Sequence, residues 1–108
     1  MKLKNDRYRK ARGGKAFWVE LFCKACGNKI LVYQKDGDGM LKRCYFNRIF
    51  WPETYEKLQH QKVKDVDKYP AFSCESCHEV IGMPIVHHDG RLAFRLRQGS
   101  FTKKRKTR

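Results

Sequence analysis

The chain has 108 residues, enough for one modest domain, and its 25 Lys+Arg against 11 Asp+Glu give a formal net charge of +14. No apolar run approaches the roughly 18 residues that a membrane span needs, and the basic N-terminus leads into no apolar signal segment. Five cysteines, an odd number, argue against a fully paired disulfide framework. We therefore expect no membrane partner and a cytoplasmic protein, or a nuclear one in a eukaryote, with reduced, metal-bound thiols.

The first segment, residues 1–15, is a basic arm with seven basic residues and one acidic residue. It lacks the apolar spacing that packs against a core, so the sequence predicts a mobile arm. Cations in such an arm bind polyanions, because each neutralised phosphate releases condensed counterions. The candidate phosphate contacts here are Arg7, Arg9, Lys10, Arg12 and Lys15.

The body, residues 16–101, is predicted to be a β domain, and its first half is residues 16–50. Here an apolar strand over 17–22 leads into Cys23-Lys-Ala-Cys26, and a second strand over 29–35 leaves it. The turn at 36–39 holds two glycines, which suit the positive φ angles of a tight hairpin, and a strand over 40–46 follows. Phe17 and Trp18 fit either the core or a surface that stacks on bases.

The linker, residues 51–70, predicts a short helix or an ordered loop after Pro52.

The second half, residues 71–101, repeats the first at an offset of 51 residues. Cys74-Glu-Ser-Cys77 matches the first cysteine pair, and the step from second cysteine to turn glycine is 13 residues in both copies, ending at Gly39 and Gly90. Strands over 80–86 and 91–97 complete the copy. The fold class is therefore mainly β, built from two pseudo-repeated units of a CxxC turn and a hairpin.

The two cysteine pairs predict one structural zinc ion, since two CxxC turns brought together complete a tetrahedral shell of four sulfurs. The predicted ligands are Cys23, Cys26, Cys74 and Cys77. Iron in the same four-sulfur shell, or His78 in place of a thiolate, are the open alternatives. Cys44 has no partner cysteine and reads as a small buried residue in a strand.

The cysteine pairs and turns resemble the knuckles of zinc-ribbon proteins. The 47 residues between Cys26 and Cys74 are more similar to the β-tent arrangement of Mss4-like and Yippee-like proteins, in which each knuckle lies beside its own hairpin. The resemblance implies a structural zinc and a β-rich fold, and it leaves the partner open.

The last segment, residues 102–108, is a second basic arm with five basic residues and no acidic one. The candidate phosphate contacts in it and in the last strand are Arg95, Arg97, Lys103, Lys104, Arg105, Lys106 and Arg108. A compact zinc body with basic arms predicts an RNA-binding component of a ribosome or another ribonucleoprotein. The alternatives are a protein-interaction or chaperone-like module within a larger assembly, and a DNA-binding, transcription-associated zinc ribbon. No set of nucleophile, base and acid is recognisable, so we do not expect an enzyme.

Overall fold

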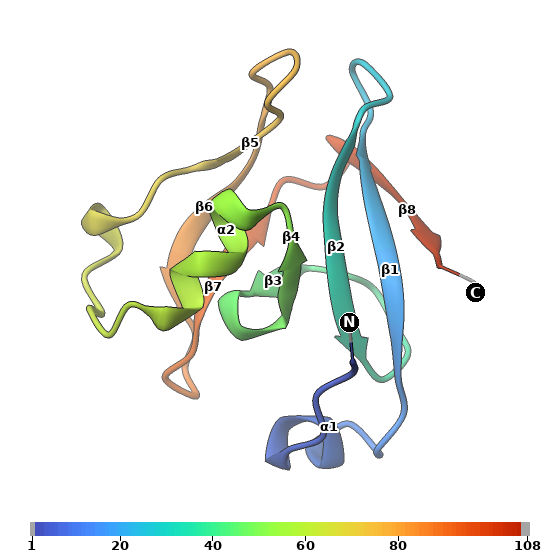
Figure 1. Ribbon diagram of the computed structural model, residues 1–108, viewed down its shortest axis with the longest axis vertical. Helices are drawn as coiled ribbons and strands as arrows, with labels where there is room; N and C mark the ends of the chain where they lie inside the picture. The colour runs from blue at the N-terminus through green and yellow to red at the C-terminus, as the bar shows by residue number, and fades with distance from the viewer. Residues whose placement is uncertain (1, 107–108) are drawn as a thin grey trace.

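The computed structural model describes residues 2–106, and within that range the chain forms eight strands in two four-stranded antiparallel sheets (Figure 1). The first sheet has the order β4-β2-β1-β8 and the second the order β3-β7-β6-β5. The strands are β1 (Ala16–Cys23), β2 (Lys29–Asp36), β3 (Arg43–Tyr45), β4 (Ile49–Trp51), β5 (Phe72–Ser73), β6 (Val80–Val86), β7 (Leu92–Leu96) and β8 (Phe101–Arg105). The prediction of a mainly β fold is confirmed.

The helical elements are short and lie at the start of the chain and in the linker. They are α1 (Arg7–Ala11), α2 (Glu53–Glu56) and the 3₁₀ turns η1 (Phe46–Arg48), η2 (Lys57–His60) and η3 (Val66–Lys68). The short helix predicted after Pro52 is therefore confirmed as α2, in which Pro52 occupies the N-cap.

The internal repeat is visible in the local structure. β6 begins 51 residues after β2, as the repeat requires. Ile30 and its counterpart Ile81 are both buried. The turn glycines Gly39 and Gly90 have φ angles of 113° and 89°, the left-handed region that favours glycine. The repeat therefore holds for the strand that follows each cysteine turn and for the glycine turn after that strand.

The pairing of the strands departs from the prediction in the first half. β6 and β7 form the expected hairpin in the second half, from Gly82↔Leu96 to Val86↔Leu92. In the first half, however, β2 pairs with β1 and β4, and β3 crosses to the second sheet, where Arg43 lies opposite Arg95. The predicted hairpin over 29–46 is wrong because β2 pairs with β1 along one edge and with β4, which follows β3 in the chain, along the other. β8 makes the reciprocal exchange by pairing with β1 of the first half.

The prediction that both basic arms are mobile is also wrong for their described residues. The segment before β1 forms α1, which Asp6 caps by accepting hydrogen bonds from the N–H groups of Tyr8 and Arg9. The C-terminal segment forms most of β8, whose backbone pairs with β1 from Val19↔Arg105 to Cys23↔Phe101. Strand pairing needs no apolar side chains, so the basic composition did not reveal it.

The core lies between the two sheets and includes residues from the linker. Its centre is a group of aromatic rings from η1, α2, β5 and β7, with centroids 4.7–5.5 Å apart. These rings belong to Phe46, Tyr55, Phe72 and Phe94. Phe17 packs partly against this core, whereas the ring of Trp18 meets that of Phe50 edge-on at 4.5 Å. Both residues are therefore packed within the fold.

Candidate metal centre and basic surface

Each CxxC pair lies in a tight turn between two strands, and the two turns have the same backbone hydrogen bonds. The Cys23 N–H donates to the carbonyl of Asn28, and the Gly27 N–H donates back to Cys23. In the second turn, the Cys74 N–H donates to Glu79 and the His78 N–H donates to Cys74, at matching distances of 2.7–2.9 Å. Both loops project from the same end of the molecule (Figure 1).

The four sulfurs of these turns come together as predicted. The Sγ atoms of Cys23 and Cys77 are 3.6 Å apart, those of Cys26 and Cys74 are also 3.6 Å apart, and all four lie within 4.8 Å of one another. A tetrahedron of sulfurs at the usual Zn–S distance has edges of about 3.8 Å. Cys23 and Cys74 are buried in the core, and Cys26 and Cys77 are exposed. The four residues form a single site for a structural zinc ion.

Backbone N–H groups of the second turn support the thiolates that zinc requires. Burial acts to raise the pKa of Cys74, but hydrogen bonds from the N–H groups of Cys77 and Ser76 and from neighbouring thiols lower it to about 7. The Cys77 sulfur accepts the N–H of Glu79, which acts to lower its pKa. Partial desolvation of this exposed sulfur and its hydrogen bonds with the other three cysteines outweigh this effect and raise that pKa to about 12. Zinc binds the thiolate form of cysteine, so zinc binding would release any protons that these sulfurs carry.

The remaining cysteine and the histidines lie outside this cluster, which contains no histidine among the described residues. Cys44 is fully buried in β3, opposite Phe94, and burial raises the pKa of its thiol. This confirms its predicted place in the core. His78 follows the second turn with a φ of 66°, close to the 80° of its counterpart Gly27.

The predicted basic residues of the first arm lie on α1 and on the loop that follows. Arg9 donates to the carbonyl of Gly14, and Arg12 donates to the carbonyl of Asp38 at 3.2 Å. Lys15 forms an exposed ion pair with the Asp38 carboxylate at 3.4 Å. Arg7 donates to the hydroxyl of Tyr8, and Lys10 is exposed. Their predicted role in binding phosphate stays a prediction.

A buried arginine, which the sequence did not indicate, holds this arm to the sheets. Arg48 has 0% exposure and donates both terminal nitrogens to the carboxylate of Asp6, at 2.6 and 3.0 Å. Its Nε donates to Asp36 at 2.8 Å. The hydrogen bond from Arg48 lowers the pKa of Asp6 to about 2. Charged residues are seldom fully buried unless they are paired, so only the fold reveals this role.

The predicted basic residues near the C-terminus divide into paired and unpaired groups. Arg97 is bound to the carboxylate of Glu79 and to the carbonyl of Val80. By contrast, the exposed side chains of Arg95 on β7 and of three residues on β8 form no ion pair within the described residues; those on β8 are Lys103, Lys104 and Arg105. Lys106 continues the strand by donating its N–H to Trp18, and Arg108 lies outside the described residues.

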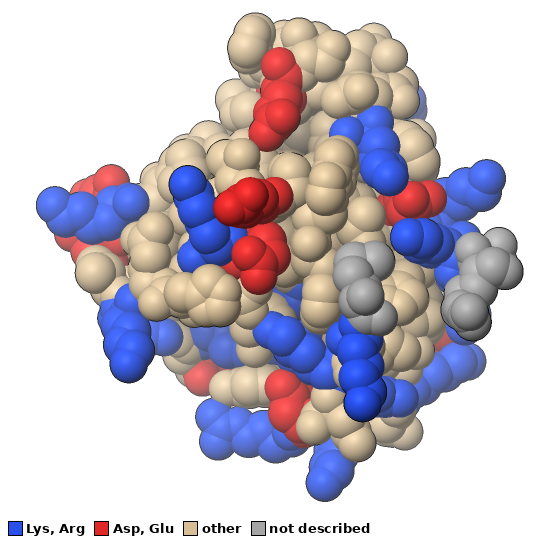
Figure 2. Space-filling model, viewed as in Figure 1, with Lys and Arg blue, Asp and Glu red and all other residues tan. Residues whose placement is uncertain are grey.

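The surface charge is distributed unevenly over the molecule. In the view of Figure 2, the Lys and Arg side chains gather over the lower half and along the right edge, where α1 and β8 lie in Figure 1. The acidic side chains are fewer and more scattered, and some lie near the centre and top of this face. On the face shown, most cations therefore lie below the cysteine turns, while β8 starts beside the first turn, with Phe101 opposite Cys23.

Comparisons of the chain with protein-family models, with curated proteins and with solved structures found no match in any of the three. The clustered cysteines establish a zinc-knuckle type of site, whereas the resemblance to β-tent families stays a prediction. Among residues 2–106, no helix has the length and apolar character to cross a bilayer.

Proposed function

We propose that this chain is a structural-zinc module that binds RNA through its cationic surface, as one component of a larger ribonucleoprotein assembly. The observation that carries the proposal is the set of exposed, unpaired cations on β8. Lys103, Lys104 and Arg105 alternate between the two faces of this strand, so cations project on both sides of it. The last three residues of this strand therefore present charge that a phosphate backbone can bind.

Cations from other elements extend this charge. Lys35, at the end of β2, is close enough to Lys103 and Arg12 that both cations lower its pKa, after the larger effect of its own burial. The guanidinium of Arg105 lies 4.2 Å from the ring centroid of Phe17 on β1. Like charges held this close repel one another in the free protein, so a polyanion that neutralises them gains affinity.

The zinc ion has a structural part in this proposal. It ties the turn after β1 to the turn after β5, and β1 is the strand that carries β8. The ion thus stabilises the position of β1, and with it the position of the cations on β8, as the structural zinc of a β-tent protein would. With all four thiolates bound to it, the site keeps no open coordination position, which supports a binding role rather than a catalytic one.

The proposal favours RNA over DNA because the described helices are too short to read a DNA major groove. α1 has five residues and α2 has four. Helix-based DNA readers insert a longer recognition helix into that groove.

The test measures the affinity of the zinc-loaded chain for a structured RNA by fluorescence anisotropy over a range of salt concentrations. Lys103→Gln with Lys104→Gln should reduce the slope of log K against log[salt] by about 1.4, since each lost phosphate contact removes about 0.7 for single-stranded segments. β8 should stay in place because its backbone, not these side chains, pairs with β1.

The matched control is Lys62→Gln with Lys68→Gln, which removes the same charge from exposed linker positions. It should leave the slope unchanged. Undetectable binding at low salt would contradict the proposal and favour a protein-interaction module. Equal affinity for duplex DNA would favour the DNA-binding alternative.

A further inference from the structure

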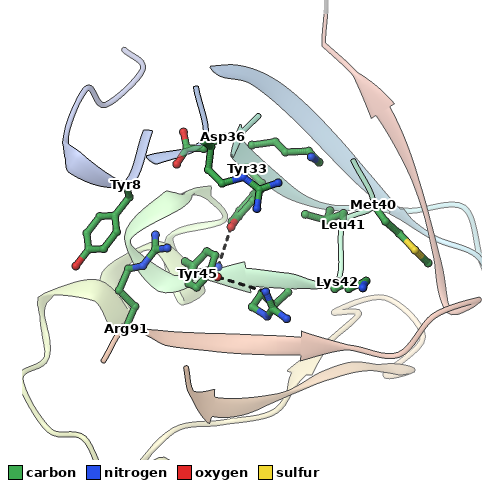
Figure 3. A pocket seen from close by; sticks show the side chains of 11 residues that line it. Tyr8, Tyr33, Asp36, Met40, Leu41, Lys42, Tyr45 and Arg91 are labelled. Atoms are coloured by element: carbon green, nitrogen blue, oxygen red, sulfur yellow. Dashed lines mark hydrogen bonds between the residues drawn. The ribbon is translucent and has the colours of Figure 1, made fainter. Parts of the chain in front are cut away.

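A cavity of about 340 Å³ lies between α1, the end of β2 and the start of β3 (Figure 3). It is at the end of β2 that is far from the cysteine turns. Its volume is within the range of pockets that bind small molecules, and a single inorganic ion would fill only part of it. The cavity is therefore large enough for a ligand of nucleotide size.

The wall of this cavity is strongly cationic. Five basic side chains line it, and they belong to Arg12, Lys35, Lys42, Arg43 and Arg91. The one carboxylate in the wall, that of Asp36, already accepts hydrogen bonds from Arg48 at 2.8 Å and from Gln34 at 2.9 Å. The cations therefore greatly outnumber the acidic groups free to neutralise them.

The cations on the β2 side of the cavity have only neutral partners. Lys35 is 5% exposed, yet its ammonium donates to the carbonyl of Gly37 rather than to a carboxylate. Arg12 likewise donates to a backbone carbonyl, and Lys42 and Arg43 form no ion pair within the described residues. Lys35 is the buried charge among them. The carboxylates of Asp36 and Asp38 act on its pKa, but its ammonium binds neither of them, so a bound anion would supply a direct partner and offset the cost of burial.

Arg91 provides a fixed set of donors on the opposite wall. Its guanidinium lies between the rings of Tyr8 and Tyr45, at 3.8 and 3.6 Å from their centroids (Figure 3). Its Nε binds Asp89, but its buried Nη1 has no hydrogen-bond partner among the described residues. An unsatisfied buried donor is rare and costly, and a ligand oxygen would satisfy it.

We propose that this cavity binds a nucleotide phosphate of the RNA, with Lys35 and Arg91 as inner donors and Lys42 and Arg43 at the rim. The inference rests on the proposed function for the source of the phosphate, because a free nucleotide offers the same chemistry. The cavity would add a defined phosphate site to the cationic surface around β8, which otherwise binds RNA by charge alone.

The first arm of the test uses adenosine 5′-monophosphate, inorganic phosphate and adenosine, each added to the zinc-loaded chain. Binding is followed by the amide NMR signals of residues 42–45 and 90–92. We expect the monophosphate to shift these signals at a concentration about tenfold lower than inorganic phosphate does, and adenosine to leave them unchanged. Equal binding of inorganic phosphate, or no shift with the monophosphate, would overturn the proposal.

The variant Lys35→Met keeps the volume and apolar stem of a buried side chain while removing its charge. It should abolish the response to the monophosphate and weaken binding of a single-stranded RNA without terminal phosphates about tenfold, as the loss of one charge-assisted hydrogen bond predicts. Its thermal midpoint should not fall, which excludes misfolding as the cause. An unchanged response in Lys35→Met would overturn the assignment.

The controls separate this site from the general function. Lys103→Gln with Lys104→Gln should keep the response to the monophosphate, and Lys62→Gln with Lys68→Gln should change neither readout. If RNA binding persists with its full salt slope while Lys35→Met has no effect, the cavity proposal fails and the proposed function stands. If the monophosphate binds and RNA does not, RNA as the source is wrong and the proposed function fails with it.

Discussion

The two ends of the molecule are built in different ways. At the zinc end, both halves of the repeat supply the same turn, with the same hydrogen bonds and two sulfurs each. At the cationic end, Arg48 binds Asp6 and Asp36, and the repeat offers no equivalent, since the positions 51 residues further on are Gly99, Lys57 and His87. The zinc site could thus be predicted from the repeat in the sequence. The ion pairs of Arg48 occur once and join distant residues, so only the folded structure shows them.

The largest effect should come from breaking the zinc end. Cys74→Ser removes a buried ligand, and structural zinc contributes on the order of 10 kcal/mol of apparent binding free energy to folding. We expect loss of the ion, measured by elemental analysis, and loss of β-type circular dichroism. Cys44→Ala, a buried cysteine outside the cluster, should keep one zinc per chain. A stable, zinc-loaded Cys74→Ser chain would show that the ion does not hold the halves together.

The next effect should come from breaking the cationic end while zinc stays bound. Arg48→Met leaves the largely buried carboxylate of Asp36 without its cation, and losing one partner of a buried pair costs about 3–5 kcal/mol. Urea unfolding of the zinc-loaded protein measures this loss. Arg95→Met, at an exposed and unpaired arginine, should change the free energy of unfolding by less than about 0.5 kcal/mol. Equal losses in the two variants would contradict the anchoring role of Arg48.

A smaller effect should separate the two roles of Asp6. Asp6→Asn keeps a good N-cap for α1 but removes the charge that faces Arg48. Because Asp6 is partly exposed, we expect a loss of only about 1 kcal/mol. Hydrogen exchange should speed up at the amides of Tyr8 and Arg9, which the side chain of Asp6 caps. Unchanged exchange there, with intact zinc binding, would show that the capping bond alone holds the arm.

The smallest effect should come from making the two knuckles identical. His78 holds the left-handed conformation that Gly27 adopts in the first knuckle, and a non-glycine residue pays for it. His78→Gly should raise the free energy of unfolding by about 0.5–1 kcal/mol. Gly27→Ala should lower it by a similar amount, because alanine is strained at a φ of 80° and no atom lies within 4 Å of the new Cβ to add a clash. Opposite signs in the two variants are the expected result, and equal signs would contradict the equivalence of the turns.

The sequence was informative wherever a local pattern carried the structure. The CxxC spacing predicted the four zinc ligands, and the turn glycines located β2, β6 and β7 to within a residue or two. These features depend on neighbours in the chain, so one sequence suffices to predict them.

The sequence was uninformative where partners are distant. β3 joins the second sheet because β1 and β4 take both edges of β2. The C-terminal segment is an ordered strand because its backbone pairs with β1. Lys35 and Arg48 are buried although such residues are usually exposed, so composition gave no sign of their burial. The cationic cavity escaped prediction because its walls come from elements that meet only in three dimensions.

The exchange of strands has a consequence for how the chain is made. β1 can pair with β8 only after β8 has left the ribosome. In the same way, Cys23 and Cys26 can share a zinc ion with Cys74 and Cys77 only after those two residues have been synthesised. Until then, the first half has an unpaired strand edge and two thiols not yet bound in the four-cysteine zinc site, and both features favour misfolding and aggregation. Folding of the first half should therefore be delayed until β8 has been synthesised, and the availability of zinc at that moment should determine how much of the product reaches the native state.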